Sequence, residues 1–151
     1  MTRKTARALA VQLLYSSEMT GKSPEETLET FFEPEHYASL TAEGDTFCEM
    51  PAQKQLDYIT AVLKCATEHR EELDGHIARC ATGWRLERIS AAVSAILRCA
   101  MCEIMFMDDV PTGVAVNEAV DLAKEYGEDG AAGFVNGVLG AFVRGEALSA
   151  E

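Results

Sequence analysis

The chain has 151 residues, a formal net charge of −12 and 48% hydrophobic side chains. These values suit one domain, or two small helical halves, with a real core. No apolar run approaches the ~18–20 residues that a membrane-spanning helix needs, and the first residues lack a signal-peptide pattern. We therefore expect a cytoplasmic protein that does not enter a membrane. The five cysteines are odd in number and sparse, which predicts free thiols.

The charge is unevenly distributed along the chain. The first 17 residues hold three basic side chains, Arg3, Lys4 and Arg7, and no acidic one, whereas the other 134 hold 10 basic and 25 acidic ones. An acidic body argues against non-specific nucleic-acid binding over the whole surface. The short basic strip still permits a local contact with phosphates.

Two helices are predicted at the start of the chain. Apolar side chains with helical spacing favour a first helix over residues 2–19, and Gly21 is typical of its end. Ser23 and Pro24 form a strong start signal for a second helix, because serine caps the first amides and proline suits the first turn. Pro34 ends the second helix.

The middle of the chain predicts a long loop followed by a long helix. Residues 33–52 are acidic and contain two prolines, so we expect a loop there. Apolar residues then share one helical face over residues 53–73. Gly75 is interpreted as the boundary between an N-terminal three-helix subdomain, 1–75, and a C-terminal helical subdomain, 76–151.

The second half predicts one short helix, 76–81, and three main helices, 86–107, 111–126 and 130–144. Sustained alternation of apolar and polar residues, the signature of strands, is missing. The expected fold is therefore all-α: about seven helices, arranged as two three-helix bundles packed together as one compact unit.

No catalytic or metal-binding constellation emerges from the histidines and cysteines. His36, His69 and His76 lack a spacing that implies a shared metal, and we interpret them as solvent-exposed. Cys99 and Cys102 have the C-x-x-C spacing but lie in the middle of a predicted helix without a second ligand pair, so we interpret them as small core residues. We expect no metal and no cofactor.

The acidic pairs 108–109 and 128–129 lie in predicted loops, where adjacent carboxylates are usually solvated. No glycine-rich phosphate loop follows a strand. We therefore expect a protein that is not an enzyme.

Three glycines, Gly133, Gly137 and Gly140, lie three and four residues apart in the last predicted helix. Each costs roughly 1 kcal/mol of helix propensity relative to alanine. Two interpretations stay open: tight packing against a neighbouring helix, or an outer surface on which a partner or an RNA backbone lies.

The basic residues Arg3, Lys4 and Arg7 share one face of the first predicted helix. Their head groups could reach successive phosphates, although a basic helix end is often only solvated. Tyr15 lies about two turns further on. It could extend this face toward bases or a protein partner, or it could form a half-buried edge of the core.

Four segments of the chain resemble the NusB family. Residues 108–124, DDVPTGVAVNEAVDLAK, are similar to the family's D-V-P-x-x-V-A-I-N-E-A pattern, and residues 134–139 read FVNGVL as in the family. Residues 95–98, AILR, with Glu103 and Ile104, resemble a third motif, and residues 7–15, RALAVQLLY, resemble the family's start. Trp84 also fits, whereas residues 22–75 match weakly.

The resemblance implies a protein with no catalysis that binds boxA-like single-stranded RNA together with the ribosomal protein NusE. The setting is ribosomal RNA transcription, in the RNA polymerase antitermination complex. On this sequence the family's RNA contacts correspond to Arg3, Lys4, Arg7, Asp129 and Phe134. The resemblance also implies a partner-binding role, which falls on Tyr15. Whether the chain forms a homodimer stays open.

Four departures from the family pattern concern these contacts. The N-terminus has fewer arginines than is usual in the family. Thr112 and Gly113 replace a frequent Tyr-Lys pair, Gly133 replaces a frequent lysine, and Val93 replaces an acidic residue. Because cationic contacts are lost, we predict weaker RNA binding by the chain alone and more reliance on the protein partner. The alternative is a NusB-like protein–protein interaction module with little or no RNA binding.

Overall fold

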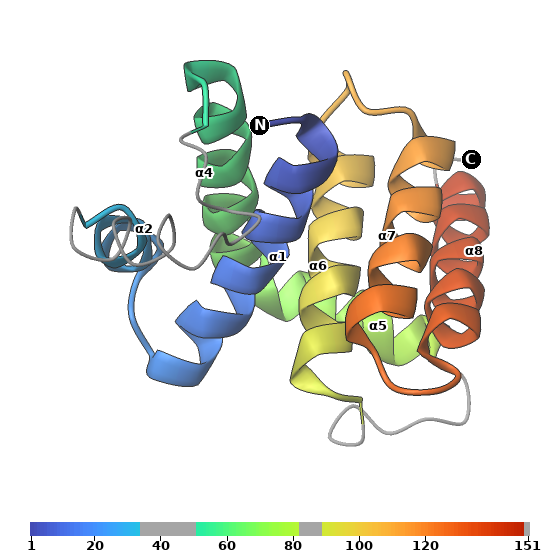
Figure 1. Cartoon of the computed structure of the whole chain (residues 1–151). Coiled ribbons are helices and arrows are strands. Elements are labelled where there is room, and N and C mark those ends of the chain that lie inside the picture. Colours follow the sequence, from blue (N-terminus) through green and yellow to red (C-terminus); the bar gives the residue numbers. More distant parts are fainter. Residues whose placement is uncertain (34–50, 82–88, 150–151) are drawn as a thin grey trace. The chain divides into compact units, whose positions relative to one another are not determined.

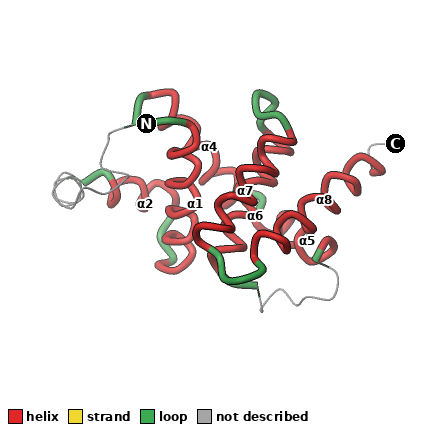
Figure 2. Tube along the Cα trace, turned by 45° about the vertical axis from the view of Figure 1, so that its right-hand side comes forward, coloured by secondary structure: helices red, strands yellow, loops and turns green. Residues whose placement is uncertain are grey.

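The computed structural model describes residues 1–33, 51–81 and 89–149. These ranges form seven helices and no strand (Figures 1 and 2), which confirms the predicted all-α fold. Within them, no helix combines the length and apolarity needed to cross a membrane. Our predictions for the 34–50 loop, His36, Cys48 and Trp84 lie outside the described residues. The helices are α1 (Arg3–Thr20), α2 (Pro24–Phe31), α4 (Gln53–Glu68), α5 (Arg70–Cys80), α6 (Ala91–Phe106), α7 (Thr112–Tyr126) and α8 (Ala131–Ser149).

The chain divides into two compact units, Met1–Thr67 and Glu68–Glu151. This division falls earlier than the predicted boundary at Gly75. Gly75 does not interrupt the structure as predicted, because it lies inside α5. A glycine costs a helix only about 1 kcal/mol, and the buried side chains of Leu73 and Ile77 on either side of it hold α5 in place.

The first unit contains α1, α2 and α4, and its helix ends form as the sequence predicts. Gly21 ends α1 with a left-handed φ of 75°, a conformation that glycine adopts without strain. Ser23 caps α2, since its hydroxyl accepts a hydrogen bond from the Glu26 amide at 3.2 Å. Buried apolar side chains of α1 and α4 supply most of the core: Leu9, Ala10, Leu13, Ile59, Val62 and Leu63.

The second unit contains α5, α6, α7 and α8. The last three run up, down and up beside one another in Figure 1, with α5 running across them in contact with α6 and α8. The helix predicted from residue 86 begins only at Ala91, because Ser90 is its cap and accepts a hydrogen bond from the Val93 amide. The last helix extends beyond the predicted residue 144 to Ser149.

The long helix predicted over residues 53–73 is wrong, because the chain breaks at His69 between α4 and α5. His69 has a φ of −105° and a ψ of 19°. Its ring stacks on Phe106 of α6 with centroids 4.5 Å apart, and its Nδ1 lies 3.3 Å from a Glu72 oxygen. These contacts fix a turn that no glycine or proline marks in the sequence.

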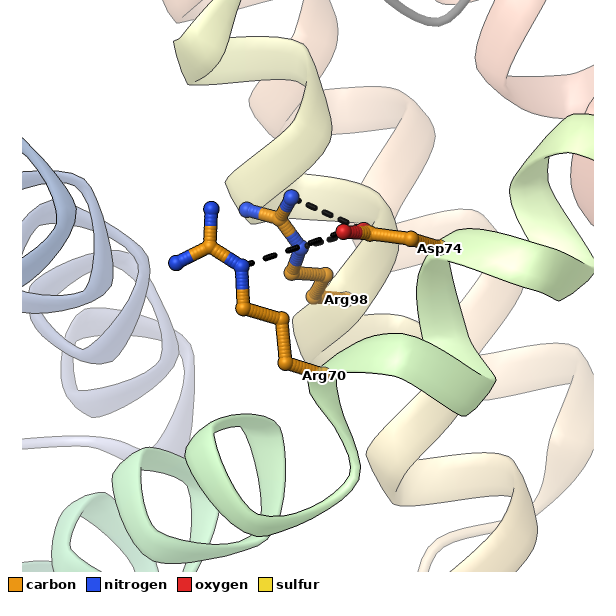
Figure 3. Close-up of polar contacts among 3 residues, drawn as sticks. All are labelled: Arg70, Asp74 and Arg98. Carbon is orange, nitrogen blue, oxygen red and sulfur yellow. Dashed lines mark hydrogen bonds and ion pairs between the residues drawn. The ribbon is translucent and has the colours of Figure 1, made fainter.

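A buried ion pair joins α5 to α6 (Figure 3). The guanidinium of Arg98 donates to Asp74 Oδ1 through Nε at 2.9 Å and Nη2 at 2.8 Å, and Arg98 is 8% exposed. Arg70 lies 3.8 Å from the other Asp74 oxygen, but its side chain is 52% exposed. Because the Arg98 charge is largely removed from water, the contact with the Asp74 carboxylate stabilises it.

We predict that Asp74→Ala lowers the free energy of unfolding by about 2–3 kcal/mol, because a buried guanidinium loses its carboxylate. Arg70→Gln is the matched control; it removes the solvent-exposed member of the same cluster and should cost less than about 1 kcal/mol. Urea unfolding followed by circular dichroism measures both variants. Equal losses for the two would show that Arg98 does not depend on Asp74.

Candidate functional site

The N-terminal end of α1 presents two accessible cationic side chains. Thr2 caps the helix, since its hydroxyl accepts from the Thr5 amide at 3.1 Å. Lys4 is exposed and Arg3 is half-buried. Arg7, by contrast, is 4% exposed. The predicted strip therefore offers Arg3 and Lys4 to a ligand more readily than Arg7.

Both arginines of this strip contact one aromatic ring on α4. The Arg3 Cζ lies 4.3 Å from the centroid of Tyr58 and the Arg7 Cζ lies 5.8 Å from it, distances typical of cation–π contacts. Arg3 Nε also donates a hydrogen bond to Gln55 Oε1 at 2.9 Å. Gln55 and Tyr58 are not predicted from the sequence, because contacts between helices far apart in the chain leave no mark in local spacing.

The outer surface of α1 carries two large apolar side chains. Tyr15 is 41% exposed and Met19, one turn further on, is 57% exposed. Tyr15 is thus more open than the half-buried core edge that we considered as one alternative. An exposed aromatic residue beside a methionine is typical of protein contact surfaces.

In the second unit, a pocket of about 220 Å³ lies between the start of α6 and the start of α8. Its apolar lining comes from Ile89, Val93 and Phe134, and Glu128 and Asp129 contribute carboxylates. Two predicted site residues, Asp129 and Phe134, therefore lie at the same pocket. The remaining lining residues are Gly130 and Ala131.

Local sequence explains how the pocket forms. Gly127 ends α7, and Gly130 adopts a φ of +87°, so the chain turns sharply before α8 begins at Ala131. Only glycine adopts this left-handed conformation routinely. The turn brings Asp129 to the pocket, while Phe134 lies one helical turn into α8.

The character of the pocket suits an uncharged flat group. Its volume is below the roughly 300 Å³ at which pockets for drug-sized ligands begin, so it fits a group about as large as one aromatic ring system. Among the residues that the structure describes, its lining contains two carboxylates and no cationic side chain. A ring with amino groups could pack on Phe134 and donate to Asp129.

The glycines of α8 do not pack against another helix. A Cβ added at Gly133 or Gly137 would meet no atom within 4 Å, and both residues are exposed. At Gly140 the nearest atom is Nη1 of Arg144, at 3.3 Å. The tight-packing interpretation is therefore wrong for Gly133 and Gly137, and the outer-surface interpretation is the one that fits.

The cysteines of α6 are core residues, as predicted. Cys99 and Cys102 are buried free thiols, and the Cys99 thiol donates to Oε1 of the fully buried Glu103 at 3.6 Å. Among the described residues, no group of three or more histidine, cysteine or acidic side chains is arranged to hold a metal ion.

The prediction that the histidines are solvent-exposed is wrong for His76. Its ring is 8% exposed and packs edge-on against Phe142 with centroids 5.0 Å apart. Glu72 and Arg79 on the same helix contact its two ring nitrogens. His76 is therefore part of the interior of the second unit.

The fold and the pocket define a small all-α protein with a cationic helix end in one unit and a ring-sized pocket in the other. The family model described as the NusB family matches residues 4–144. The chain is 38% identical over 145 residues to the transcription antitermination protein NusB of Symbiobacterium thermophilum, an alignment that covers 96% of this chain and 91% of the relative. The chain therefore belongs to the NusB family.

Solved structures agree with this assignment. T. maritima NusB superposes with a TM-score of 0.77 at 25% identity, covering 95% of this chain and 92% of that one. A chain from the crystal structure of the antitermination factors NusB and NusE in complex with dsRNA superposes with a TM-score of 0.75 at 25% identity, covering 95% and 96%.

We predict that Gly137→Ala raises the free energy of unfolding by up to about 1 kcal/mol, because helix propensity improves and the new Cβ meets no neighbour. Gly127→Ala is the contrasting variant. Its Cβ would lie 2.5 Å from the Ala131 Cβ and 2.7 Å from the Ala123 oxygen, so it should lower stability. Thermal melts compare the two. A destabilised Gly137→Ala protein would contradict the outer-surface interpretation.

Proposed function

We propose that this protein is an RNA-binding transcription antitermination factor without catalytic activity. It binds boxA-like single-stranded RNA together with ribosomal protein NusE, in the cytoplasm, within the RNA polymerase antitermination complex on ribosomal RNA operons. The observation that carries the proposal is the pocket at the start of α8, because it joins Phe134 and Asp129 in a space suited to one base.

The proposed RNA contacts divide by chemistry between the two units. One unstacked base enters the pocket, where the Phe134 ring, Ile89 and Val93 supply apolar contact and Asp129 accepts a hydrogen bond from an amino group of the base. In the first unit, Arg3 and Lys4 contact RNA phosphates. Arg7 is buried and adds positive charge behind Arg3 without direct contact.

The thin cationic strip makes the protein partner important. Two accessible cations release few counterions, and the net charge of −12 opposes approach of RNA elsewhere. We infer that RNA binds weakly to the chain alone and tightly when NusE is present. Tyr15, with the exposed Met19 beside it, supplies the contact with that partner.

The second candidate function is a protein–protein interaction module with little RNA binding. The exposed Tyr15 and Met19 on α1, together with the acidic surface, favour it. A titration of labelled boxA-like RNA with the chain, with and without NusE, distinguishes the two. An antitermination adaptor binds the labelled RNA when NusE is present. An interaction module binds NusE but leaves the labelled RNA unbound.

We predict that Phe134→Leu weakens RNA binding in the presence of NusE by roughly five- to 150-fold, the cost of about 1–3 kcal/mol when an aromatic stacking partner is lost. Leucine keeps the apolar filling of the pocket, so the fold should persist. Phe134→Tyr retains the ring and should bind nearly as well as the wild type. Equal affinities for the leucine and tyrosine variants would show that no base stacks on this ring.

A gain of function is expected at Gly133, which is exposed beside the pocket and has no atom within 4 Å of an added Cβ. Gly133→Lys should tighten RNA binding and steepen the dependence of log affinity on log salt concentration by about 0.7, the value for one added contact to a single strand. Gly133→Ala controls for helix propensity. An unchanged salt slope would mean that no phosphate passes this position.

A further inference from the structure

We propose that Tyr58 and Gln55 on α4 are positioning residues for Arg3, which they hold as a preorganised fork for one RNA phosphate. This inference rests on the proposed function, and it assigns a role to a segment in which the family motifs are weak. The three residues lie within the first unit, and so do the contacts between them.

Two contacts fix the plane and the direction of the guanidinium. The Tyr58 ring supports its face, with Cζ 4.3 Å from the centroid, and Gln55 Oε1 accepts from Nε at 2.9 Å. Tyr58 is 5% exposed, so the supporting ring is itself held by the core. Of the five N–H donors of an arginine, this arrangement uses the one on Nε and keeps the four on Nη1 and Nη2 for a ligand.

Comparison with Arg98 shows why this arrangement suits binding. Arg98 is 8% exposed and gives both Nε and Nη2 to the carboxylate of Asp74, so its charge is neutralised within the fold. Arg3 is half-buried, and both contacts described for it are with uncharged groups, an amide and a phenol ring. Its positive charge therefore remains available to an anion.

The position of Arg3 on the helix adds to the same effect. It is the first residue of α1, directly after the Thr2 cap, and the amides of a helix N-terminus carry partial positive charge. Lys4 is exposed next to it. A planar fork of fixed direction matches two phosphate oxygens, whereas a lysine acts as a flexible point charge.

Preorganisation predicts a measurable gain in affinity. An arginine that is free in solution loses rotamer freedom when it binds, and an arginine already held on Tyr58 and Gln55 loses less. Removing either support should weaken binding about three- to tenfold while Arg3 still reaches its phosphate. Replacing Gln55 with a glutamate should instead remove the contact between Arg3 and the phosphate, because the new carboxylate then neutralises the charge of Arg3 within the chain.

The experiment measures binding of boxA-like single-stranded RNA by the full chain with NusE present, over a range of salt concentrations. Arg3→Gln and Gln55→Glu should each weaken binding and flatten the salt slope by about 0.7. Gln55→Leu should weaken binding three- to tenfold with the slope kept. Gln53→Glu is the matched control, because it adds the same charge to α4 at an exposed position two residues away.

Tyr58 supplies a second test, in which folding is separated from positioning. Tyr58→Phe keeps the ring under Arg3 and should bind like the wild type, while Tyr58→Leu should lose affinity. If Tyr58→Leu is unfolded by circular dichroism, the Gln55 variants decide alone, because Gln55 is only half-buried.

Four outcomes separate the inference from the proposed function. If Arg3→Gln weakens RNA binding but Gln55→Glu has the same affinity and salt slope as Gln53→Glu, the positioning role is wrong and the proposed function stands. If Arg3→Gln changes neither affinity nor slope, Arg3 meets no phosphate and the inference falls, while base binding at Phe134 is unaffected. If the wild type binds no RNA in the presence of NusE, both the proposed function and the positioning role are wrong. The pattern predicted above supports both.

Discussion

The burial of α6 is the constraint on which the second unit depends. Eleven consecutive residues, from Val93 to Glu103, are buried, so α6 must be covered on every side of its middle turns. Within the second unit, α5, α7 and α8 each contact α6 and supply part of that cover. Two charged side chains, Arg98 and Glu103, fall within this buried stretch, and Asp74 of α5 meets the first of them. Packing around one helix thus fixes the start of α8, where the pocket lies.

The proposed binding mode follows from a shortage of positive charge. A protein with 25 acidic and 13 basic side chains cannot rely on its general field to attract RNA. Under the proposed function it uses a few contacts of good geometry instead, a stacked arginine at one helix end and a ring-lined pocket for a base. Specificity and the protein partner then contribute more than electrostatic attraction, and salt should influence binding less than in strongly basic RNA-binding proteins.

The sequence predicted those helix ends that are determined by adjacent residues. Ser23 with Pro24, and Gly21, marked helix ends correctly because capping and left-handed turns depend on adjacent residues. The break at His69 escaped prediction because the apolar face of the helix continues past it, and a ring on another helix fixes the turn. The predicted boundary at Gly75 was wrong, because packing of the neighbouring side chains of α5 outweighs the low helix propensity of glycine.

The residues of the candidate site could be predicted from the sequence in part, but their arrangement could not. Asp129 and Phe134 were found through motif resemblance, but their union with Ile89 and Val93 in one pocket depends on how α6 and α8 pack. Arg7 looked equivalent to Arg3 by spacing, yet it is buried. Spacing along one helix could not distinguish them, because burial depends on how the rest of the fold covers each side chain.

The thiols of this chain form a built-in reporter of local opening. Cys99 and Cys102 are buried in the middle of α6, whereas Cys65 and Cys80 are only partly covered. An alkylating reagent therefore reaches the inner pair only when α6 separates from its neighbours, so their labelling rate tracks the opening of the second unit under native conditions. RNA or a partner that reduces the opening of that unit would slow the labelling of Cys99 and Cys102. The native thiols serve as the probe, so no cysteine has to be introduced.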